Sequence, residues 1–311
     1  MTPETDFDEV VICLFDGEYH LGVAALTNSL VKYQFKGLIN VGYRGGVLPL
    51  WVQQLQPLSD NFFRISDDVT IHFKQVLSNM HLGYFKPFFI KETFDDYPAA
   101  KKFYYFDADI IVQAPWNLYF SWVENGVCLC LDSAFHFIHH SHPWRKDWRA
   151  LVKGRDHLLN PTFQYFNSGF LGIDRNYIIL IDRWIDITNH FISKNGEINY
   201  FIKDSYSSVR GDQDLLNAVI TTSSDIEINV MGKEAMGFSL PATLMLHAIG
   251  ERKPWNSSFM VHLLKYGNKP STTDKVFLSM SKYPINIFSV FQYSLKKIDL
   301  SSACVLGRFL G

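Results

Sequence analysis

The sequence predicts an α/β fold with a mostly parallel central sheet, and three consecutive segments near its start indicate this class. Residues 10–16 form a short apolar run that ends in an acidic residue, and residues 38–44 form a second apolar run. Between them, residues 21–35 repeat apolar side chains at intervals typical of an amphipathic helix. A strand, a helix and a second strand in succession form the repeating unit of α/β domains.

The remainder of the chain continues this alternation. Helices are expected over residues 181–192, where apolar residues recur at helical intervals, and over residues 211–220, which an acidic turn opens. Further strands are expected at residues 102–106, 126–132, 166–174, 225–231 and 244–250. No internal repeat or low-complexity linker interrupts the pattern. We therefore expect one main domain over residues 1–260 and a helical appendage over residues 261–311.

The composition is that of a folded protein with no strong attraction to polyanions. Hydrophobic residues make up 47% and charged residues 19% of the 311 residues, so the chain can bury a substantial core. The formal net charge is −2 at pH 7, so the chain lacks the excess of basic residues that is typical of nucleic-acid-binding proteins. We therefore expect no nucleic-acid partner.

The cysteines and the lengths of the apolar runs indicate a cytoplasmic protein. Cys13, Cys128 and Cys130 lie inside apolar runs and no C-x-x-C pair is present, so buried thiols are expected rather than a metal or redox site. Reduced thiols favour the cytoplasm. The acidic N-terminus lacks the features of a signal peptide, and no apolar stretch reaches the ~18–20 residues that span a bilayer. The expected location is the cytoplasm, with the inner face of the membrane as an alternative.

Two carboxylates follow the apolar segment at residues 103–106. Asp107 and Asp109 stand where this expected strand reaches the surface, and ligands bind at the carboxyl ends of strands in open α/β sheets. Both side chains can point into the same crevice. Hard divalent cations prefer oxygen ligands, so the pair is a candidate metal site. A solvated acidic turn is the alternative, because a bare D-x-D pattern is common.

A second motif lies in residues 247–255, HAIGERKPW, where the pattern H-x-x-G-x-x-K-P-W is matched at each of its fixed positions. The matching residues are His247, Gly250, Lys253, Pro254 and Trp255. Three further blocks, FDADIIV, FNSGFLGID and GDQDLLN, precede it. Together, and in this order, the four blocks resemble glycosyltransferase family 8, the family of glycogenin and of bacterial lipopolysaccharide glucosyl- and galactosyltransferases. The resemblance covers residues 10–260.

The resemblance implies a fold, a reaction and a set of ligands. The fold would be GT-A, the Rossmann-like fold of nucleotide-diphospho-sugar transferases, with the catalytic domain over residues 1–260. The enzyme would be a hexosyltransferase that moves glucose or galactose from a UDP-sugar, with Mn²⁺ or Mg²⁺ as cofactor and with retention of configuration. The acceptor would be a saccharide or a lipid-linked saccharide, in the synthesis of bacterial surface polysaccharide or lipopolysaccharide.

The same resemblance assigns roles to individual residues. The implied metal ligands are Asp107, Asp109 and His247. The implied donor contacts are Asp16, Lys86, Asp107, Ala108, Asn167, Ser168, Gly250 and Lys253. The implied catalytic residues are Asp132, Asp212, Gln213 and Lys253. A glutamine is a weak nucleophile, so a front-face reaction, in which the leaving phosphate assists the acceptor hydroxyl, is favoured over a covalent intermediate.

Several of these residues also have a purely structural interpretation. Asp16 could equally cap the helix that follows it. Asp212 and Asp214 would be favoured at a helix N-terminus by the helix dipole alone. Lys86 is followed by Pro87, which departs from the family pattern and would start or kink a helix, so the alignment of Lys86 stays open.

Residues 135–148 combine histidines with aromatic side chains. The segment contains His136, His139, His140 and His142 together with Phe135, Phe137, Trp144 and Trp148. A second metal site would need an acidic or Cys partner, and none completes the ligand set. We therefore favour an exposed loop on the acceptor side, whose rings stack on a saccharide or pack in the core.

The C-terminal appendage carries an amphipathic pattern over residues 284–298. Ile287, Phe291, Leu295 and Ile298 recur at helical spacing, with lysines near the polar side. Such a stripe usually docks a helix on its own domain. The alternative is a membrane-surface helix that brings the enzyme to a lipid-linked acceptor.

Two other functions account for part of the pattern. Haloacid-dehalogenase-type phosphatases also carry an apolar strand followed by D-x-D, but near the N-terminus and with a later G-D-x-x-x-D, whose last position is Leu216 in this chain. The other alternative is a non-catalytic nucleotide-sugar-binding protein. The presence of all three implied metal ligands and of Lys253 argues against it.

Overall fold

A central sheet with helices on both faces organises the protein, and the computed structural model describes residues 7–135, 137–152, 158–202, 204 and 206–309. The strands are β1 (Glu9–Phe15), β2 (Gly37–Tyr43), β3 (Gln56–Ser59), β4 (Phe62–Ser66), β5 (Val69–Gln75), β6 (Lys102–Phe106), β7 (Ile110–Val112), β8 (Val127–Leu131), β9 (Phe166–Asp174), β10 (Ile228–Met231) and β11 (Met245–His247). The α-helices are α1 (His20–Lys32), α2 (Leu82–Asp96), α3 (Trp116–Val123), α4 (Pro143–Leu151), α5 (Ile179–Ser193), α6 (Asp212–Thr221), α7 (Phe259–Tyr266), α8 (Thr272–Ser279) and α9 (Val290–Leu306). Within residues 1–260, each strand and helix expected from the sequence is present.

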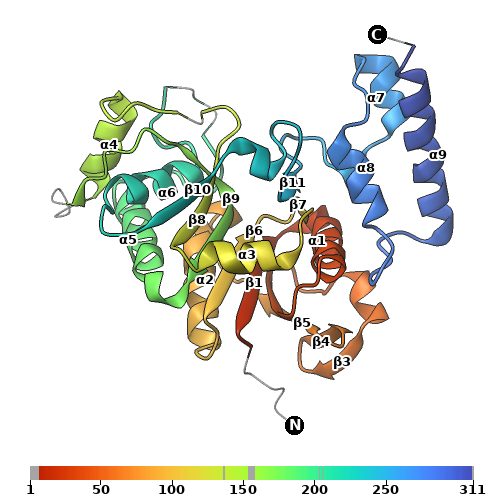
Figure 1. Ribbon diagram of the computed structural model, residues 1–311, viewed down its shortest axis with the longest axis horizontal. Helices are drawn as coiled ribbons and strands as arrows, with labels where there is room; N and C mark the ends of the chain where they lie inside the picture. Colours follow the sequence, from red (N-terminus) through yellow and green to blue (C-terminus); the bar gives the residue numbers. More distant parts are fainter. Residues whose placement is uncertain (1–6, 136, 153–157, 203, 205, 310–311) are drawn as a thin grey trace.

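The helices that cover this sheet confirm the predicted α/β class. The sheet itself is mixed, and it is less parallel than expected. Its described strands follow the order β10-β8-β9-β6-β1-β2-β5-β4-β3 (Figure 1). β9 runs antiparallel to both β6 and β8, and β3, β4 and β5 pair antiparallel at one edge. The edge strands pair this way because a tight turn at Asn61, where φ is 62°, joins β3 to β4.

Two apolar layers enclose the sheet, and β1 contributes to both. Val11 and Cys13 pack in the layer that contains α1 and α3, whereas Val10 and Ile12 pack in the layer that contains α2, α5 and α6. A strand covered on both faces needs a continuous apolar run, which is the pattern that the sequence shows. Cys13, Cys128 and Cys130 are buried free thiols, as expected.

Helix α1 lies directly against the D-x-D loop because residue 22 has no side chain. A Cβ atom at Gly22 would lie 2.0 Å from the carbonyl oxygen of Ala108 and 2.9 Å from the ring of Trp255. Real Cβ atoms do not approach a backbone oxygen so closely, so glycine is what permits this contact. The first helix, the loop after β6 and the HAIGERKPW segment therefore meet at one point.

The start of the C-terminal appendage is attached to the main domain through a buried asparagine. The side-chain amide of Asn28 donates to the carbonyls of Met280, at 2.7 Å, and Ile285, at 2.8 Å, and its oxygen accepts from the Ile285 N–H. Trp255 and Phe277 pack beside this contact in one buried cluster. Residues 277–285 are thus held against α1.

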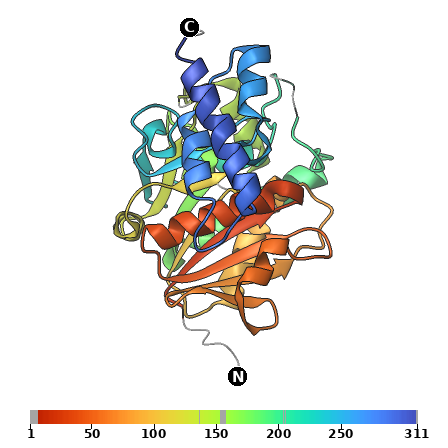
Figure 2. The same ribbon diagram turned by 90° about the vertical axis from the view of Figure 1, so that its right-hand side faces the viewer.

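Helix α9 lies at the outside of the molecule beyond α7 and α8, as Figures 1 and 2 both show. It begins at Val290 rather than at residue 284, because a capping box formed by Ser289 and Gln292 starts it. Ile287 lies before the helix and packs against the core. Among the described residues, no helix combines the length and the apolar composition needed to cross a bilayer.

The expectation that the stripe on α9 docks it on its own domain is wrong. Phe291, Leu295 and Ile298 are 71%, 50% and 63% exposed. The helix docks instead through its other side, where Leu300 and Ala303 pack in one buried cluster with α7. The apolar stripe therefore faces solvent.

Candidate active site

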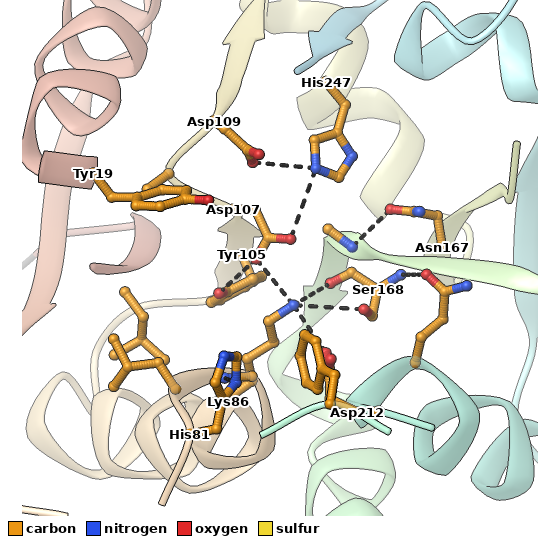
Figure 3. A pocket seen from close by; sticks show the side chains of 18 of the residues that line it. Tyr19, His81, Lys86, Tyr105, Asp107, Asp109, Asn167, Ser168, Asp212 and His247 are labelled. Atoms are coloured by element: carbon orange, nitrogen blue, oxygen red, sulfur yellow. Dashed lines mark hydrogen bonds and ion pairs between the residues drawn. The ribbon is translucent and has the colours of Figure 1, made fainter. Parts of the chain in front are cut away.

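Polar side chains from three strands meet at one edge of the sheet. β1 and β6 are parallel neighbours and end there, and the antiparallel β9 begins there. They border a cavity of about 760 Å³ (Figure 3). The expected site residues that line it are Asp16, Lys86, Asp107, Ala108, Asp109, Asn167, Ser168, Asp212, Gln213 and His247. Three others, Asp132, Gly250 and Lys253, lie outside its lining.

Asp107, Asp109 and His247 converge on one point at the cavity wall. β11 pairs with β7 so that His247 lies opposite Ile110, which brings the imidazole beside the D-x-D loop. Its Nε2 is 3.1 Å from Asp109 Oδ1 and 3.9 Å from Asp107 Oδ2, and one ligand atom from each residue lies within 4.8 Å of the others. Two carboxylates and one imidazole are a mixed oxygen and nitrogen donor set that could hold a divalent cation.

Lys253 contacts the candidate metal cluster (Asp107, Asp109 and His247) from outside the cavity lining. Its Nζ donates to Asp109 Oδ2 and to the carbonyl of Ala248, at 2.6 Å each. Burial by itself raises the pKa of the Asp109 carboxyl, but His247 and Lys253 outweigh burial and hold that pKa below its ordinary value. Asp109 is therefore ionised, as a metal ligand must be. Gly250 in the preceding turn has a φ of 96°, a conformation that side chains rarely adopt.

Lys86 links the D-x-D loop to the start of α6. Its Nζ is 2.9 Å from Asp107 Oδ1 and 2.9 Å from Asp212 Oδ2, and it donates to the Ser168 carbonyl at 3.2 Å. Burial lowers the pKa of Lys86, but the two carboxylates outweigh burial and raise it, so the amine stays charged. Pro87 lies inside α2 without ending it, so it does not prevent Lys86 from reaching the site.

The first turn of α6 is fixed against the start of β9. Gln213 Oε1 accepts the Ser168 N–H at 3.2 Å, and Asn217 exchanges two hydrogen bonds with the backbone of Phe166, both at 2.8 Å. Asp212 and Asp214 also stand in the first turn of the helix, where its dipole favours them. The structural interpretation of this block is therefore confirmed, and the contacts of Asp212 and Gln213 with a sugar stay a prediction.

Asp132 positions the cavity wall and does not line the cavity. Its Oδ1 accepts the N–H groups of Ala134, at 3.0 Å, and Phe135, at 3.1 Å, and its Oδ2 accepts the side-chain amide of Asn167 at 3.0 Å. Asn167 in turn accepts the Gly169 N–H. Both carboxylate oxygens of Asp132 thus accept hydrogen bonds from other protein groups.

Asp16 and Arg44 form the opposite end of the cavity. Asp16 makes no capping hydrogen bond to the following helix, so the capping alternative is not what the structure shows. Its Oδ2 lies 3.4 Å from Arg44 Nη1, and Arg44 also donates to the carbonyls of Ser78 and Met80. Arg44 follows β2, so the rule that ligands bind at strand ends could have identified it from the sequence.

Tyr105 is a second site residue absent from the sequence predictions. Its hydroxyl donates to Asp107 Oδ1 at 2.9 Å, and it lines the cavity with Tyr19, His81 and Arg210. Tyr105 stands two residues before Asp107, and side chains at that spacing on a strand share a face. Strand periodicity could therefore have found Tyr105, whereas His81 and Arg210 come from distant loops.

The histidine-rich segment forms no second metal cluster among the described residues, and His136 lies outside them. His139 and His140 pack on Phe163, with ring centroids 5.1 and 5.2 Å apart. Trp148 is buried in the core, whereas Phe137 is 58% exposed. The acceptor-side role of this segment stays a prediction.

The fold is that of glycosyltransferases of known structure, so the predicted GT-A fold is confirmed. The structure matches the bifunctional glycosyltransferase WbbM in its apo state with a TM-score of 0.52, at 16% identity over 97% of this chain and 53% of that chain. It matches the galactosyltransferase LgtC in complex with donor and acceptor sugar analogues with a TM-score of 0.52, at 13% identity over 92% of this chain and 99% of LgtC. An active-site mutant of LgtC gives a TM-score of 0.53 at 12% identity, with the same coverage.

These identities are low, so the likeness concerns the fold. The chain spans about half the length of the WbbM chain that it matches. No protein-family model and no curated protein sequence matches the chain. The phosphatase alternative gains no support. Leu216 occupies the position where the G-D-x-x-x-D motif of those phosphatases requires its last aspartate, and its side chain is fully buried in the core.

Proposed function

We propose that the protein is a retaining glycosyltransferase of family 8 that moves glucose or galactose from a UDP-sugar to a saccharide acceptor. The observation that carries this proposal is the convergence of Asp107, Asp109 and His247 on the wall of a ligand-sized cavity, within a glycosyltransferase fold. The likeness to LgtC, whose structure contains donor and acceptor sugar analogues, supports a site for both substrates.

The proposed metal site accounts for the charge that the reaction develops. Asp107, Asp109 and His247 would hold Mn²⁺ or Mg²⁺, which supplies positive charge to the diphosphate oxygens as the sugar–phosphate bond breaks. The uridine would lie at the end of the cavity formed by Asp16 and Arg44. Lys253 holds Asp109 in place and adds a second positive charge on the leaving-group side.

The protein groups around the proposed sugar position are rigid, which suits a reaction that depends on orientation. Lys86 keeps Asp107 and Asp212 at fixed positions, and Gln213 is held by the Ser168 N–H. Because Gln213 is a weak nucleophile, the acceptor hydroxyl would attack on the same face from which the diphosphate leaves, and the leaving phosphate would take its proton.

The first test is hydrolysis of a panel of nucleotide sugars in the absence of acceptor. UDP-glucose or UDP-galactose is expected to be cleaved in the presence of Mn²⁺ and not in excess chelator, and UDP with Mn²⁺ should raise the melting temperature because it binds the native state. Tighter binding of a guanine or cytidine nucleotide would overturn the uridine assignment. Binding without cleavage of any donor or transfer to any acceptor would favour a non-catalytic nucleotide-sugar-binding protein.

We also propose that α9 brings the enzyme to a lipid-linked acceptor at an anionic membrane surface, on the cytoplasmic face. Phe291, Leu295 and Ile298 form its exposed apolar stripe. Residues 261–311 contain seven Lys and Arg but two acidic residues, and so carry +5 in a chain whose net charge is −2. Both acids are engaged inside the protein: Asp299 accepts the first N–H groups of α7, and Asp274 pairs with Arg252. The outer surface of the appendage is therefore apolar and basic, which suits anionic lipid.

The membrane proposal predicts that Phe291→Ser, Leu295→Ser and Ile298→Ser together abolish co-sedimentation with anionic vesicles. Each basic residue near such a surface contributes about 1 kcal/mol, so added salt should also weaken binding of the unaltered protein. A matched control replaces three apolar residues that are exposed elsewhere, Val47, Leu50 and Leu77, and should leave co-sedimentation intact. Equal binding of both triple variants, or equal binding to neutral vesicles, would contradict the proposal.

A further inference from the structure

The cavity has a second end, where Arg210 lies. Asp16 follows β1, whereas Arg210 contacts Phe135 and Trp144, which follow β8 on the other side of β6 and β9. The candidate metal cluster after β6 lies between these two ends. If the nucleotide occupies the Asp16 end, as the proposed function requires, the Arg210 end is the part of the cavity left for the acceptor.

The guanidinium of Arg210 lies over two aromatic rings, which are steeply inclined to each other. Its Cζ lies 4.6 Å from the centroid of the Trp144 ring and 5.2 Å from that of Phe135. A guanidinium over an aromatic ring is attracted to it by its positive charge. These two contacts hold the charged group of Arg210 at this end of the cavity.

The neighbouring carboxylate, Asp214, does not use the hydrogen-bond donors of this guanidinium. Its Oδ1 accepts the Tyr165 hydroxyl at 2.6 Å, and its Oδ2 accepts the backbone N–H of Arg210 at 2.8 Å. The Nε of Arg210 forms an ion pair with Oδ2 at 3.7 Å, which is beyond hydrogen-bond distance, and has no hydrogen-bond partner in the part of the chain that the structure describes.

Arg210 differs in this respect from the other lysine and arginine that line the cavity. Lys86 is paired with Asp107 and Asp212, and the guanidinium of Arg44 binds two backbone carbonyls and Asp16. Among the described residues, no hydrogen bond involves the guanidinium of Arg210, although it is only 22% exposed. A fixed, charged and unused hydrogen-bond donor in a substrate cavity is suited to an anionic group of a ligand.

We propose that Arg210 selects an acceptor saccharide that carries an anionic group, either a carboxylate or a phosphate ester. The inference rests on the proposed glycosyltransferase function and names the acceptor class for it. A carboxylate or phosphate forms two parallel hydrogen bonds with a guanidinium, whereas a neutral hydroxyl forms one weaker bond. The acceptor that fits this end of the cavity is thus an acidic sugar or a phosphorylated sugar.

The test compares three acceptors that differ in one group: a glucoside, the matching glucuronide and the matching 6-phosphate. The wild-type enzyme should transfer to at least one charged acceptor with a higher kcat/KM than to the neutral one, and the stronger of the two identifies the anionic group. Arg210→Gln should lower the charged-to-neutral ratio by about ten- to a hundredfold, because it removes a charge-assisted bidentate contact. Arg210→Lys, which keeps the charge without the planar fork, should fall between them.

Lys146→Gln is the matched control, because Lys146 is an exposed cation on α4 outside the cavity lining and should leave the ratio unchanged. Equal use of charged and neutral acceptors by the wild-type enzyme would overturn the inference. So would an Arg210→Gln variant that loses activity equally with all three acceptors or that raises KM for the donor instead. Hydrolysis of the UDP-sugar without acceptor separates the two proposals: if the wild-type enzyme hydrolyses donor without preferring charged acceptors, only the acceptor inference fails.

Discussion

Replacing Asp109 by asparagine is expected to lower the rate of sugar transfer about a thousandfold or more. The substitution keeps the shape of the side chain but removes the charge that the proposed cation and Lys253 share. It should also abolish the rise in melting temperature that UDP and Mn²⁺ produce together. The measurement is the initial rate of transfer over a range of Mn²⁺ concentrations.

The same substitution leaves Lys253 buried without its carboxylate partner, so stability must be measured in parallel. Breaking a buried ion pair costs about 3–5 kcal/mol, and the variant should melt at a lower temperature while still unfolding cooperatively. Asp60→Asn, at an exposed turn outside the cavity lining, is the control and should change neither quantity. Full activity of Asp109→Asn at low Mn²⁺ would remove Asp109 from the metal site.

Replacing Lys86 by methionine is expected to have the second large effect, on stability as well as on transfer. Methionine has a similar volume but leaves Asp107 and Asp212 facing each other without the cation that lies 2.9 Å from both. Loss of one partner of a buried pair costs about 3–5 kcal/mol. We expect this loss in the free energy of unfolding by urea, together with at least a hundredfold loss in transfer as both carboxylates move.

A double variant distinguishes the electrostatic cause from a packing defect. Lys86→Met combined with Asp212→Asn removes one of the two unpaired charges, so stability should partly recover while transfer stays low. The control is Lys101→Met, which breaks an exposed pair with Asp8 and should cost no more than about 1 kcal/mol. If the double variant is as unstable as Lys86→Met, packing rather than charge explains the loss.

The parts of the fold that could be predicted are those in which local pattern and burial agree. β1 and β8 are apolar runs buried on both faces, so their composition predicts them as strands. Residues 69–75 alternate buried and half-buried side chains at a strand period, and their alternating apolar and polar sequence is typical of a strand. The capping box at Ser289 and Gln292 likewise gives the start of α9, which the apolar spacing misplaced.

The candidate site divides in the same way. Asp107, Asp109 and His247 stand in motifs, and the structure brings them together. The roles expected for Asp132 and Lys253 depended on where their side chains point. Both side chains lie outside the cavity lining, and each binds a residue that lines the cavity. Contacts such as that of Arg210 with Trp144 join segments distant in sequence. No local pattern encodes such a contact, because it depends on how loops pack over the sheet edge.

The close contact at Gly22 also bears on how distant relatives of this chain can be recognised. The D-x-D pattern alone is short and occurs by chance, but in this protein its middle residue lies against a helix that has no room for a side chain at residue 22. Consider a related protein that keeps both carboxylates of the D-x-D pattern but has a larger residue at the position of Gly22. In that protein either the first helix or the D-x-D loop must lie elsewhere. Glycine at that position, with tryptophan at the position of Trp255, is therefore a criterion for inheritance of this D-x-D loop geometry that the acidic residues by themselves do not provide.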